Sequence, residues 1–557
     1  MEVVAAIVVL MIILFIKGIF DVKKERESII RQIKEEWGNI PSEEYTESKF
    51  EAIRSYYDTI LDPSLDIDDI TWADLNMDEI YMIINNTGSS FGEEYLYALL
   101  RKPQFDESVL NERKELINYF TTHKENREKL QEMLLRLGKL KQISLHNYLE
   151  RTNDVEIKKP WLHYLYAFGF LGSMLLMIVN MPLGIVLTLS FLANNVIAYT
   201  RTKAKIEIYF NVLSYVLSVV DGVDELSKSK LDGLEPYMSR LQAAAKEFST
   251  FKKGAGIVLG GRSATGGLAD ILIDYLRMIF HIDIMKFNNM IHELRKHMDA
   301  ILDIYEVVGL LDSMIAVASF RQLANVYCEP ELSHRKEPFL DIKNVYHPMI
   351  HNPVKNSIYQ KNNVLLTGSN ASGKSTFLRT IGINQILAQT IYTTLSNSYR
   401  ASYFKIYSSM ALKDDIFSNE SYYIVEIKSL KRILDQLSDE YPVLCFIDEV
   451  LRGTNTLERI SASAEILNSF SKHKVLCMAA THDIELTHIL EKSYTNYHFQ
   501  EEVVDNDVLF DYKLYKGRAM SKNAIKLLSI MGYDKAIIQA ATKRANAFLE
   551  TGEWLTI

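Results

Sequence analysis

The residues best suited to chemistry are the glycines, lysine and serine of one short stretch, TGSNASGKST at 367–376. Gly368 is followed by four residues and then by Gly373, Lys374 and Ser375, which completes the G-x-x-x-x-G-K-[ST] pattern. Glycines let backbone N–H groups surround a phosphate, the lysine reaches the outer phosphates, and the serine hydroxyl can bind Mg²⁺. The pattern predicts a loop that binds ATP with Mg²⁺. The residues predicted to contact the nucleotide are Gly368, Ser369, Asn370, Ala371, Ser372, Gly373, Lys374, Ser375 and Thr376.

Two acids and a histidine follow later apolar strands. The apolar strand in YPVLCFIDEV ends at Asp448 and Glu449, and the strand in KVLCMAATHD brings Thr481 and His482 to the same sheet edge. Asp448 is expected to share the Mg²⁺ with Ser375, and Glu449 to orient or deprotonate the attacking water. His482 lies where a γ-phosphate can be sensed. Paired acids at a strand end are otherwise ordinary surface residues, and a single histidine is usually structural, so it is their combination with the loop that predicts ATP hydrolysis.

The elements that must position these residues also follow from the sequence. NNVLL at 362–366 reads as a buried strand before the loop, and TFLRTIGINQILAQ reads as a helix after it. From about residue 340, short β-rich runs alternate with helices, which is typical of a mostly parallel sheet with helices on its faces. The carboxyl ends of parallel strands meet at one sheet edge, where ligands bind. Residues 336–557 are therefore predicted to form an α/β P-loop ATPase domain with an ABC-like sheet.

Length, charge and cysteine use set broad limits. A chain of 557 residues is too long for one core. A net charge of −9 argues against a surface that binds nucleic acid everywhere, although a local basic groove remains compatible with it. Cys328, Cys445 and Cys477 lie far apart without a CxxC spacing, so neither a disulfide framework nor a zinc site is indicated. The soluble parts are expected in a reducing cytosol.

The N-terminus carries an apolar stretch, residues 3–20, interrupted only by Lys17. As a helix it would span about 27 Å at roughly 1.5 Å per residue, close to the ~30 Å hydrocarbon layer of a membrane. A cleaved signal peptide is the rival interpretation, but it requires a basic region before the apolar run. Here Met1-Glu2 precede the run and basic residues follow it, so residues 1–22 are predicted to be a retained transmembrane anchor.

A second apolar region lies between Trp161 and Tyr199, which contains no Asp, Glu, Lys or Arg. VNMP at 179–182 divides it into two lengths that each suffice to cross a bilayer, so residues 156–205 are predicted to form a transmembrane hairpin. A buried hairpin in a soluble core is the alternative. The flanking basic residues, which place both ends in the cytoplasm, are Lys158, Lys159, Arg201, Lys203 and Lys205. The sequence thus predicts three spans and a multi-pass protein of the cell membrane whose ATPase domain lies in the cytoplasm.

The remaining regions, 23–155 and 206–335, read as helical. A glycine-rich segment, KKGAGIVLGGRSATGG at 252–267, interrupts the second region. Its basic residues allow a phosphate-contacting loop, but a flexible connector explains the composition as well.

Four blocks of the C-terminal half resemble the MutS family of DNA mismatch-repair ATPases. They are TGSNASGKSTFLR, SSMALKDDIFSNESYYIVEI, FIDEVLRGTNTLERISASAEIL and ATHDIELT, in the family's order. The resemblance covers about residues 305–550, and a fainter match at 86–120 is similar to the start of the family's helical core and lever domain. The resemblance implies that the helical regions form a long core and lever.

The resemblance also implies an ATPase that forms a homodimer in which each nucleotide site is completed by the partner. By position, Ser418 and Ser421 would reach the partner's γ-phosphate, and RGTNT at 452–456 would lie beside the dimer interface. Asn370 would lie in the nucleotide loop, and His482 would match the family's switch histidine. Dimerisation helices are expected at the C-terminus, and DNA is the expected ligand of the helical arms.

Several departures from the family's pattern limit these expectations. The loop has Ser369, Ala371 and Ser372 where the family usually shows proline, methionine and glycine, and Glu420 stands where arginine is common. MSKNAIKLL at 520 replaces the usual serine-tyrosine-glycine stretch. The chain before the lever match is too short for the mismatch-reading and connector domains. Phe91-Gly92-Glu93 has the letters of the mismatch-wedging motif but lies inside the lever match, so we interpret it as a coincidence.

These observations favour a membrane-anchored MutS-type ATPase that controls a DNA-binding clamp. The alternative is an ATP-gated membrane scaffold that acts on an unknown protein partner or on the bilayer without nucleic acid. An ABC-type transporter would explain the spans and the loop together, but no LSGGQ-like signature lies between Lys374 and Asp448. Three spans with few polar positions also offer a poor transport pathway.

Overall fold

The structure is a computed structural model in which contacts divide the chain into two compact units. The helical unit comprises Met1–Leu61, Met82–Leu99 and Lys114–Leu323. The sheet unit comprises Asp62–Tyr81, Leu100–Arg113 and Ala324–Ile557. The residues that the structure describes are 17, 20–21, 23–140, 144–152, 161–227, 231–248, 275–335, 337–369, 372–410, 422–437, 440–451, 454–504, 507–519, 525, 528 and 531–557. The predicted domain boundaries stay predictions, since this division follows contacts alone.

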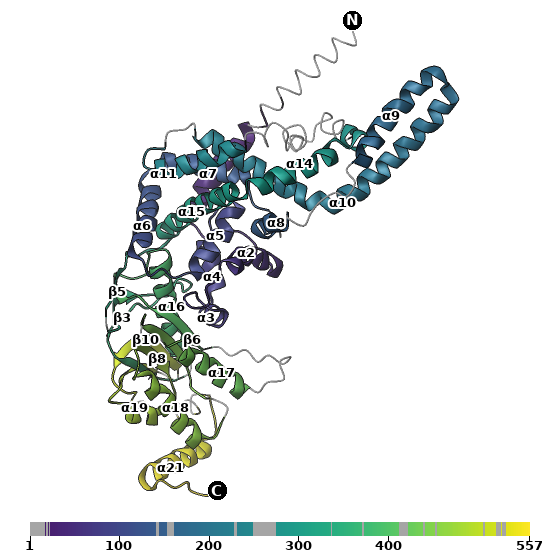
Figure 1. The fold of residues 1–557 in the computed structure, drawn as a ribbon. Helices are drawn as coiled ribbons and strands as arrows, with labels where there is room; N and C mark the ends of the chain where they lie inside the picture. Colours follow the sequence, from purple (N-terminus) through teal and green to yellow (C-terminus); the bar gives the residue numbers. More distant parts are fainter. Residues whose placement is uncertain are drawn as a thin grey trace. The chain divides into compact units, whose positions relative to one another are not determined.

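The described part of the helical unit is built from helices (Figure 1). Three helices, α4 (Met77–Ile84), α5 (Ser90–Arg101) and α6 (Glu107–Thr122), cross the division between the units. The remaining named helices of this unit are α2 (Glu47–Thr59), α7 (Lys124–Leu137), α8 (Leu145–Arg151), α9 (Trp161–Val179), α10 (Met181–Ser227), α11 (Glu235–Glu247), α14 (Ile282–Lys296) and α15 (Met298–Leu323).

Helix α15 forms the centre of the helical unit, because almost every residue from Ile304 to Arg321 is buried. Its Asp312 accepts hydrogen bonds from the backbone of Gly88 and Ser89 at 3.0 Å each, just before α5 begins. Burial raises the pKa of Asp312 to about 6. Phe91, on α5, is fully buried and its ring lies 5.1 Å from that of Tyr305. Phe91 is thus a core side chain, in agreement with the interpretation of its motif as a coincidence.

Helices α9 and α10 form the antiparallel hairpin predicted at the second apolar region, with Asn180 as the break (Figure 1). Within the described residues, these two helices are long and apolar enough to cross a membrane. Within residues 161–200, few apolar side chains are buried; Phe168 is 67% exposed and Val179 85%. A buried soluble hairpin would show the opposite pattern. The stretch predicted as the first span lies, apart from Lys17 and Phe20, outside the described residues.

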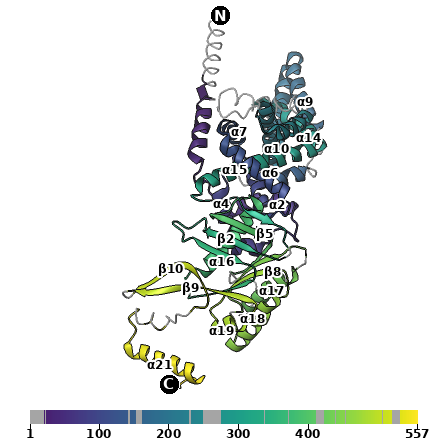
Figure 2. The ribbon, with the colours of Figure 1, turned by 90° about the vertical axis from the view of Figure 1, so that its left-hand side faces the viewer.

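The sheet unit contains a six-stranded sheet in the order β10-β9-β4-β8-β7-β6. Five of these strands run parallel, and β10 is antiparallel to β9. Figure 2 shows β9 and β10 side by side. The strands are β4 (Asn363–Thr367), β6 (Lys405–Ser409), β7 (Val443–Asp448), β8 (Val475–Ala480), β9 (Tyr494–Val504) and β10 (Asp507–Lys516). The mixed α/β architecture with a mostly parallel sheet is therefore confirmed.

A second, four-stranded sheet in the order β1-β5-β2-β3 belongs to the same unit. Its strands are β1 (Glu331–Ser333), β2 (Leu340–Val345), β3 (Asn356–Gln360) and β5 (Ser398–Ser402). The helices of the unit are α3 (Asp69–Asp74), α16 (Lys374–Thr390), α17 (Tyr422–Asp435), α18 (Thr456–Phe470), α19 (Ile484–Ile489) and α21 (Lys535–Thr551).

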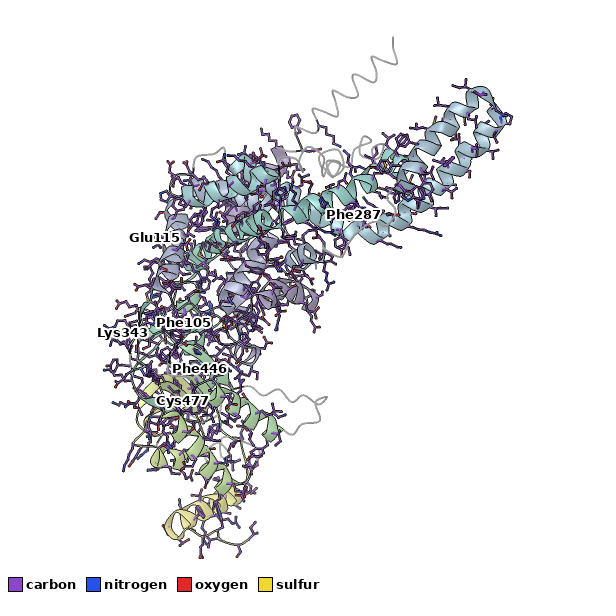
Figure 3. The ribbon with its side chains drawn as sticks, viewed as in Figure 1. Phe105, Glu115, Phe287, Lys343, Phe446 and Cys477 are labelled. Atoms are coloured by element: carbon purple, nitrogen blue, oxygen red, sulfur yellow. The ribbon has the colours of Figure 1, made fainter. Side chains whose placement is uncertain are left out.

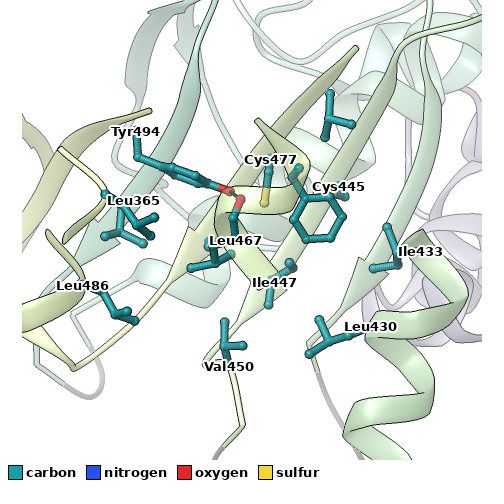
Figure 4. Close-up of a cluster of buried hydrophobic side chains, with 14 of the residues drawn as sticks. Leu365, Leu430, Ile433, Cys445, Ile447, Val450, Leu467, Cys477, Leu486 and Tyr494 are labelled. Atoms are coloured by element: carbon teal, nitrogen blue, oxygen red, sulfur yellow. Dashed lines mark hydrogen bonds between the residues drawn. The ribbon is translucent and has the colours of Figure 1, made fainter. Parts of the chain in front are cut away.

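Apolar side chains from the central strands form the core of the sheet unit. Phe446 of β7 and Cys477 of β8 lie in neighbouring strands (Figure 3). Ile447 and Leu467 belong to a buried cluster between the sheet and its helices, which Tyr494 closes by donating its hydroxyl to the carbonyl of Leu467 at 2.8 Å (Figure 4). The continuous apolar runs that predicted these strands are explained by burial on both faces.

Helix α3, from the N-terminal half of the chain, packs against β6 in the sheet unit. The Asp74 carboxylate accepts hydrogen bonds from the Ser408 hydroxyl at 2.7 Å and from the Met410 backbone at 2.9 Å. Its carbonyl accepts another from Arg379 of α16 at 2.8 Å. Helix α3 therefore supports both the end of β6 and the helix that follows the nucleotide loop.

Candidate nucleotide-binding site

The predicted nucleotide loop lies between β4 and α16, at the carboxyl edge of the six-stranded sheet. Gly368 and Gly373 have φ values of 144° and 105°, which side chains with a Cβ rarely adopt. The buried Lys374 donates from Nζ to the carbonyls of Gly368 at 2.9 Å and Ser369 at 2.8 Å. The ammonium group thus lies across the loop, where the pattern predicts the nucleotide's outer phosphates.

Ser375 and Asp448 are brought together as predicted. The Ser375 hydroxyl donates to Asp448 Oδ2 at 2.5 Å. The sheet fixes this meeting, because Asp448 at the end of β7 pairs with Ala480 of β8, which in turn pairs with Leu366 of β4. A hydroxyl and a carboxylate are hard oxygen donors, which suit Mg²⁺ shared with phosphate oxygens. The residues present therefore fit a magnesium ion.

Glu449 and His482 also meet, with His482 Nε2 2.7 Å from Glu449 Oε1. The side chain of Glu449 is 24% exposed and that of His482 is 36% exposed, so water can reach the carboxylate. Glu449 has a φ of 60°, a left-handed conformation that costs a non-glycine residue about 1 to 3 kcal/mol. Its backbone N–H donates to the carbonyl of Ala480 at 2.9 Å, which ties the turn to β8. A strained acid at the end of a central strand is typical of an active site.

The other described residues that were predicted to contact the nucleotide differ in their hydrogen bonds and burial. Ser369 donates its hydroxyl to Glu501 of β9. Ser372 is buried, and its hydroxyl has no hydrogen-bond partner among the described residues. Thr376 lies at the start of α16 and lines a cavity described below. Thr481, which precedes His482, is tied to β4 through its N–H bond to the carbonyl of Leu366 at 2.9 Å.

Several predicted residues lie outside the described part of the chain. They are Asn370, Ala371, Ser418, Ser421 and the first two residues of the 452–456 segment. The predicted roles of these residues, including the contact with a partner's γ-phosphate, stay predictions. The glycine-rich segment 252–267 and Glu420 also lie outside the described residues.

A cavity beside the nucleotide loop was not predicted from the sequence. It has a volume of about 410 Å³, and Gly373 and Thr376 form one side of it. Aromatic and imidazole side chains form much of the rest; those lining the cavity are Tyr346, His347, His351, Phe377, Phe499 and Tyr512. Burial, followed by the charge of Arg379, lowers the pKa of His347 to about 4, so this ring is neutral at pH 7. The cavity suits a flat heteroaromatic ring.

The ring of Tyr512 reaches this cavity through an irregularity in β10. The pairing of β10 with β9 shifts between Phe510 and Leu514, and Tyr512 within this bulge has a φ of 54°. The side chain of Asn356, on β3, holds the bulge by donating to the Tyr512 carbonyl at 3.0 Å and accepting from the Leu514 N–H at 2.9 Å. Bulges commonly redirect a side chain next to a functional site.

Comparison with known proteins agrees with this geometry. The sequence pattern of MutS domain V matches residues 364–549, from β4 to α21. Residues 364–549 of this chain carry the domain V of the MutS family. The predicted resemblance is therefore confirmed, and the MutS match contains Gly368, Lys374, Asp448, Glu449 and His482.

Individual relatives bear MutS names. MutS protein homolog 4 of Homo sapiens is 32% identical over 266 residues, which cover 44% of this chain and 28% of the relative. DNA mismatch repair protein MutS of Thermotoga maritima is 30% identical over 266 residues, which cover 46% of this chain and 33% of the relative. This chain therefore spans about a third or less of the length of these two relatives.

Proposed function

We propose that this protein is a membrane-anchored MutS-family ATPase that binds ATP with Mg²⁺, dimerises and uses hydrolysis to control a DNA-binding clamp. The MutS domain V supports ATP hydrolysis at the level of the family. The observation that carries the proposal is the meeting of two pairs at one sheet edge, Ser375 with Asp448 at 2.5 Å and Glu449 with His482 at 2.7 Å. Both pairs lie at the edge where the nucleotide loop begins.

Each residue has a distinct task in the proposed reaction. Lys374 exchanges its bonds to the loop carbonyls for bonds to the outer phosphates. Ser375 and Asp448 would hold a Mg²⁺ ion, and such an ion would supply positive charge beside the phosphates. Glu449 accepts a hydrogen bond from the attacking water and aligns it, while His482 fixes the carboxylate. The adenine ring would occupy the cavity beside Gly373, against the ring of Tyr512.

Dimerisation and DNA binding are proposed from the family. The names of the bacterial relatives refer to DNA mismatch repair, and this chain would act as a homodimer on DNA. Ser418 and Ser421 would complete the partner's site from the segment before α17. Recognition of a mismatched base is not part of the proposal, because Phe91 of the Phe91-Gly92-Glu93 motif is a buried core side chain of α5.

The proposed location is the cell membrane, with the ATPase domain in the cytoplasm. The support is the outward-facing apolar surface of α9 and α10, on which Ile178 is 83% exposed and Leu175 66%. Water would make such a surface costly, whereas lipid tails would cover it. Residues 1–22 would add the first of three spans.

The proposal is tested by ATPase assays on the full-length protein in lipid, with no DNA and with duplex, mismatched or branched DNA. Magnesium-dependent hydrolysis that rises with DNA supports a DNA clamp, and stimulation by mismatched or branched DNA alone defines the structure it senses. Hydrolysis that no DNA changes would contradict the clamp. Absence of hydrolysis under all conditions would contradict the ATPase itself.

A second candidate is an ATP-gated scaffold that acts on a protein partner or the bilayer without nucleic acid. The observation that favours it is the continuity of α10, whose first part lies in the exposed hairpin and whose later residues, such as Leu213 and Val216, are buried in the helical unit. A movement of that unit would therefore reach the hairpin directly. Crosslinking of the hairpin that depends on ATP, with activity that DNA does not alter, would favour the scaffold.

A further inference from the structure

The turn that follows β7 is held in an unusual backbone conformation. Glu449 and Leu451 both have φ values of 60°, and neither is glycine. Such a turn persists only where neighbouring elements hold it. Since the turn carries the carboxylate proposed to act on water, the groups that hold it determine where that carboxylate lies.

Among the described residues, three elements make hydrogen bonds to this turn. Strand β8 accepts the Glu449 N–H at the carbonyl of Ala480, at 2.9 Å. From α18, Ser463 donates its hydroxyl to the carbonyl of Val450 at 3.2 Å. From α17, the carboxylate of Glu426 accepts the N–H of Leu451. Of these three contacts, the last is the one in which a carboxyl side chain accepts the backbone N–H.

Glu426 is an unusual residue for this position. Its side chain is almost fully buried, at 3% exposure. Acids are rarely buried unless a specific contact compensates for lost hydration. The contact with Leu451 lies two residues from Glu449, so it acts on the turn and leaves the Glu449 carboxylate next to His482.

Glu426 also lies close, along the chain, to the segment proposed to complete the partner's site. Helix α17 begins at Tyr422, directly after Ser421, and Glu426 is one helical turn further on. A displacement of the start of α17 is therefore transmitted through a rigid helix to the Leu451 N–H and the turn that carries Glu449.

We propose that Glu426 is a positioning residue for hydrolysis: it holds the turn of Glu449 in its left-handed conformation and links that turn to the segment before α17. This inference rests on the proposed ATPase function and adds to it a route by which a partner can align the catalytic carboxylate. In this proposal Glu426 acts on the turn through the Leu451 N–H, and the task of aligning the water stays with Glu449.

The test uses the full-length protein in lipid and three variants of Glu426. Glu426→Ala removes the acceptor, Glu426→Asp keeps a carboxyl group but shortens the side chain, and Glu426→Gln keeps an acceptor oxygen at the same reach. Ser429→Ala is the matched control, because Ser429 lies on the same helix and is equally buried. Its hydroxyl has no hydrogen-bond partner in the part of the chain that the structure describes.

We expect kcat to fall about tenfold or more in Glu426→Ala and Glu426→Asp, with the Kd for ATP within twofold of the wild type. Glu426→Gln should keep most of the activity, and Ser429→Ala should match the wild type. If Glu426→Ala does not fold, the comparison of Glu426→Asp with Glu426→Gln decides.

Two results would overturn the inference. One is unchanged kcat in Glu426→Ala and Glu426→Asp. The other is a parallel loss of ATP binding, kcat and thermal stability in every Glu426 variant, which would assign the residue to the fold alone. A wild type without ATPase activity would instead overturn the proposed function, so the two failures are distinguishable.

Discussion

At the scale of single residues, the main feature of the site is the different surroundings of two adjacent acids. Asp448 ends β7 and contacts the Ser375 hydroxyl, whereas Glu449 begins the turn and contacts His482. Successive residues at a strand end point in different directions. One acid can therefore serve the metal while its neighbour serves the water.

The first prediction concerns Asp448. Asp448→Asn keeps an oxygen that accepts the Ser375 hydroxyl but removes the charge that attracts Mg²⁺. We expect the Mg²⁺ concentration required for half-maximal activity to rise roughly tenfold or more, because a charged ligand of the cation is lost. Magnesium titration of ATPase activity measures this. Asp435→Asn, an exposed position on α17, is the control, and an equal Mg²⁺ requirement in both variants would refute the metal role.

The second prediction concerns His347, whose pKa burial lowers to about 4. An unfolded chain has a histidine pKa of about 6.5, so between these values the unfolded state binds a proton that the folded state does not. Stability is therefore lost as the pH falls through this window and is unaffected above it. On going from pH 7.5 to pH 5, the free energy of unfolding should therefore fall by about 2 kcal/mol more in the wild type than in His347→Gln.

Thermal or urea unfolding of both proteins at the two pH values measures this difference. His351→Gln, which replaces an exposed histidine nearby, controls for the loss of an imidazole. A wild type and a His347→Gln variant that respond equally to pH would contradict the assignment of a buried neutral ring at position 347.

At the scale of elements, the bulge in β10 is the feature on which the cavity depends. Asn356 bonds both the Tyr512 carbonyl and the Leu514 N–H, so its amide fixes the bulge from β3. In Asn356→Ala, the bulge loses both bonds and Tyr512 leaves the side of Gly373. We predict that the Kd for ATP rises about fivefold or more, with kcat at saturating ATP nearly unchanged.

Equilibrium binding of a fluorescent ATP analogue tests this prediction. Ser357→Ala, one position further along β3 on the opposite face, is the control. A Kd that stays at the wild-type value in Asn356→Ala would show that Tyr512 does not contribute to the base site.

The elements that could be predicted from the sequence are those with local patterns. The apolar runs before Gly368, Asp448 and His482 predicted β4, β7 and β8, and the pairing of these strands brings the predicted residues to one edge. The Tyr512 bulge could not be predicted, because Asn356 lies 156 residues away and neither residue has a local signature. The support of β6 by α3 depends on similarly distant contacts, such as that of Asp74 with Ser408.

At the scale of the whole molecule, the proposed topology has to account for both the exposed apolar hairpin and the nucleotide site. The proposed topology places Asn180, at the break between α9 and α10, outside the cell, and places the ATPase domain inside. Both Asn180 and Ser471 are exposed, and Ser471 lies just after α18 in the sheet unit. These two positions therefore offer a matched pair of probes for the topology.

We predict that Asn180→Cys reacts with a membrane-impermeant thiol reagent in intact cells, whereas Ser471→Cys reacts only after the membrane is opened. Of the native cysteines, Cys445 and Cys477 are buried and Cys328 is partly exposed, so the wild type serves as the labelling control. Labelling of both variants only after permeabilisation would place the hairpin on the cytoplasmic side and would refute the predicted spans.

The most direct test of ATP hydrolysis by this site is the turnover and nucleotide content of Glu449→Gln in the full-length protein in lipid. We predict that this variant binds ATP with Mg²⁺ as the wild type does, accumulates as a closed ATP-bound dimer, and hydrolyses at least about a hundredfold more slowly. Glu465→Gln, an exposed glutamate on α18, should keep full turnover. Turnover in Glu449→Gln equal to that of the wild type would contradict the assignment of Glu449 and, with it, the proposed site.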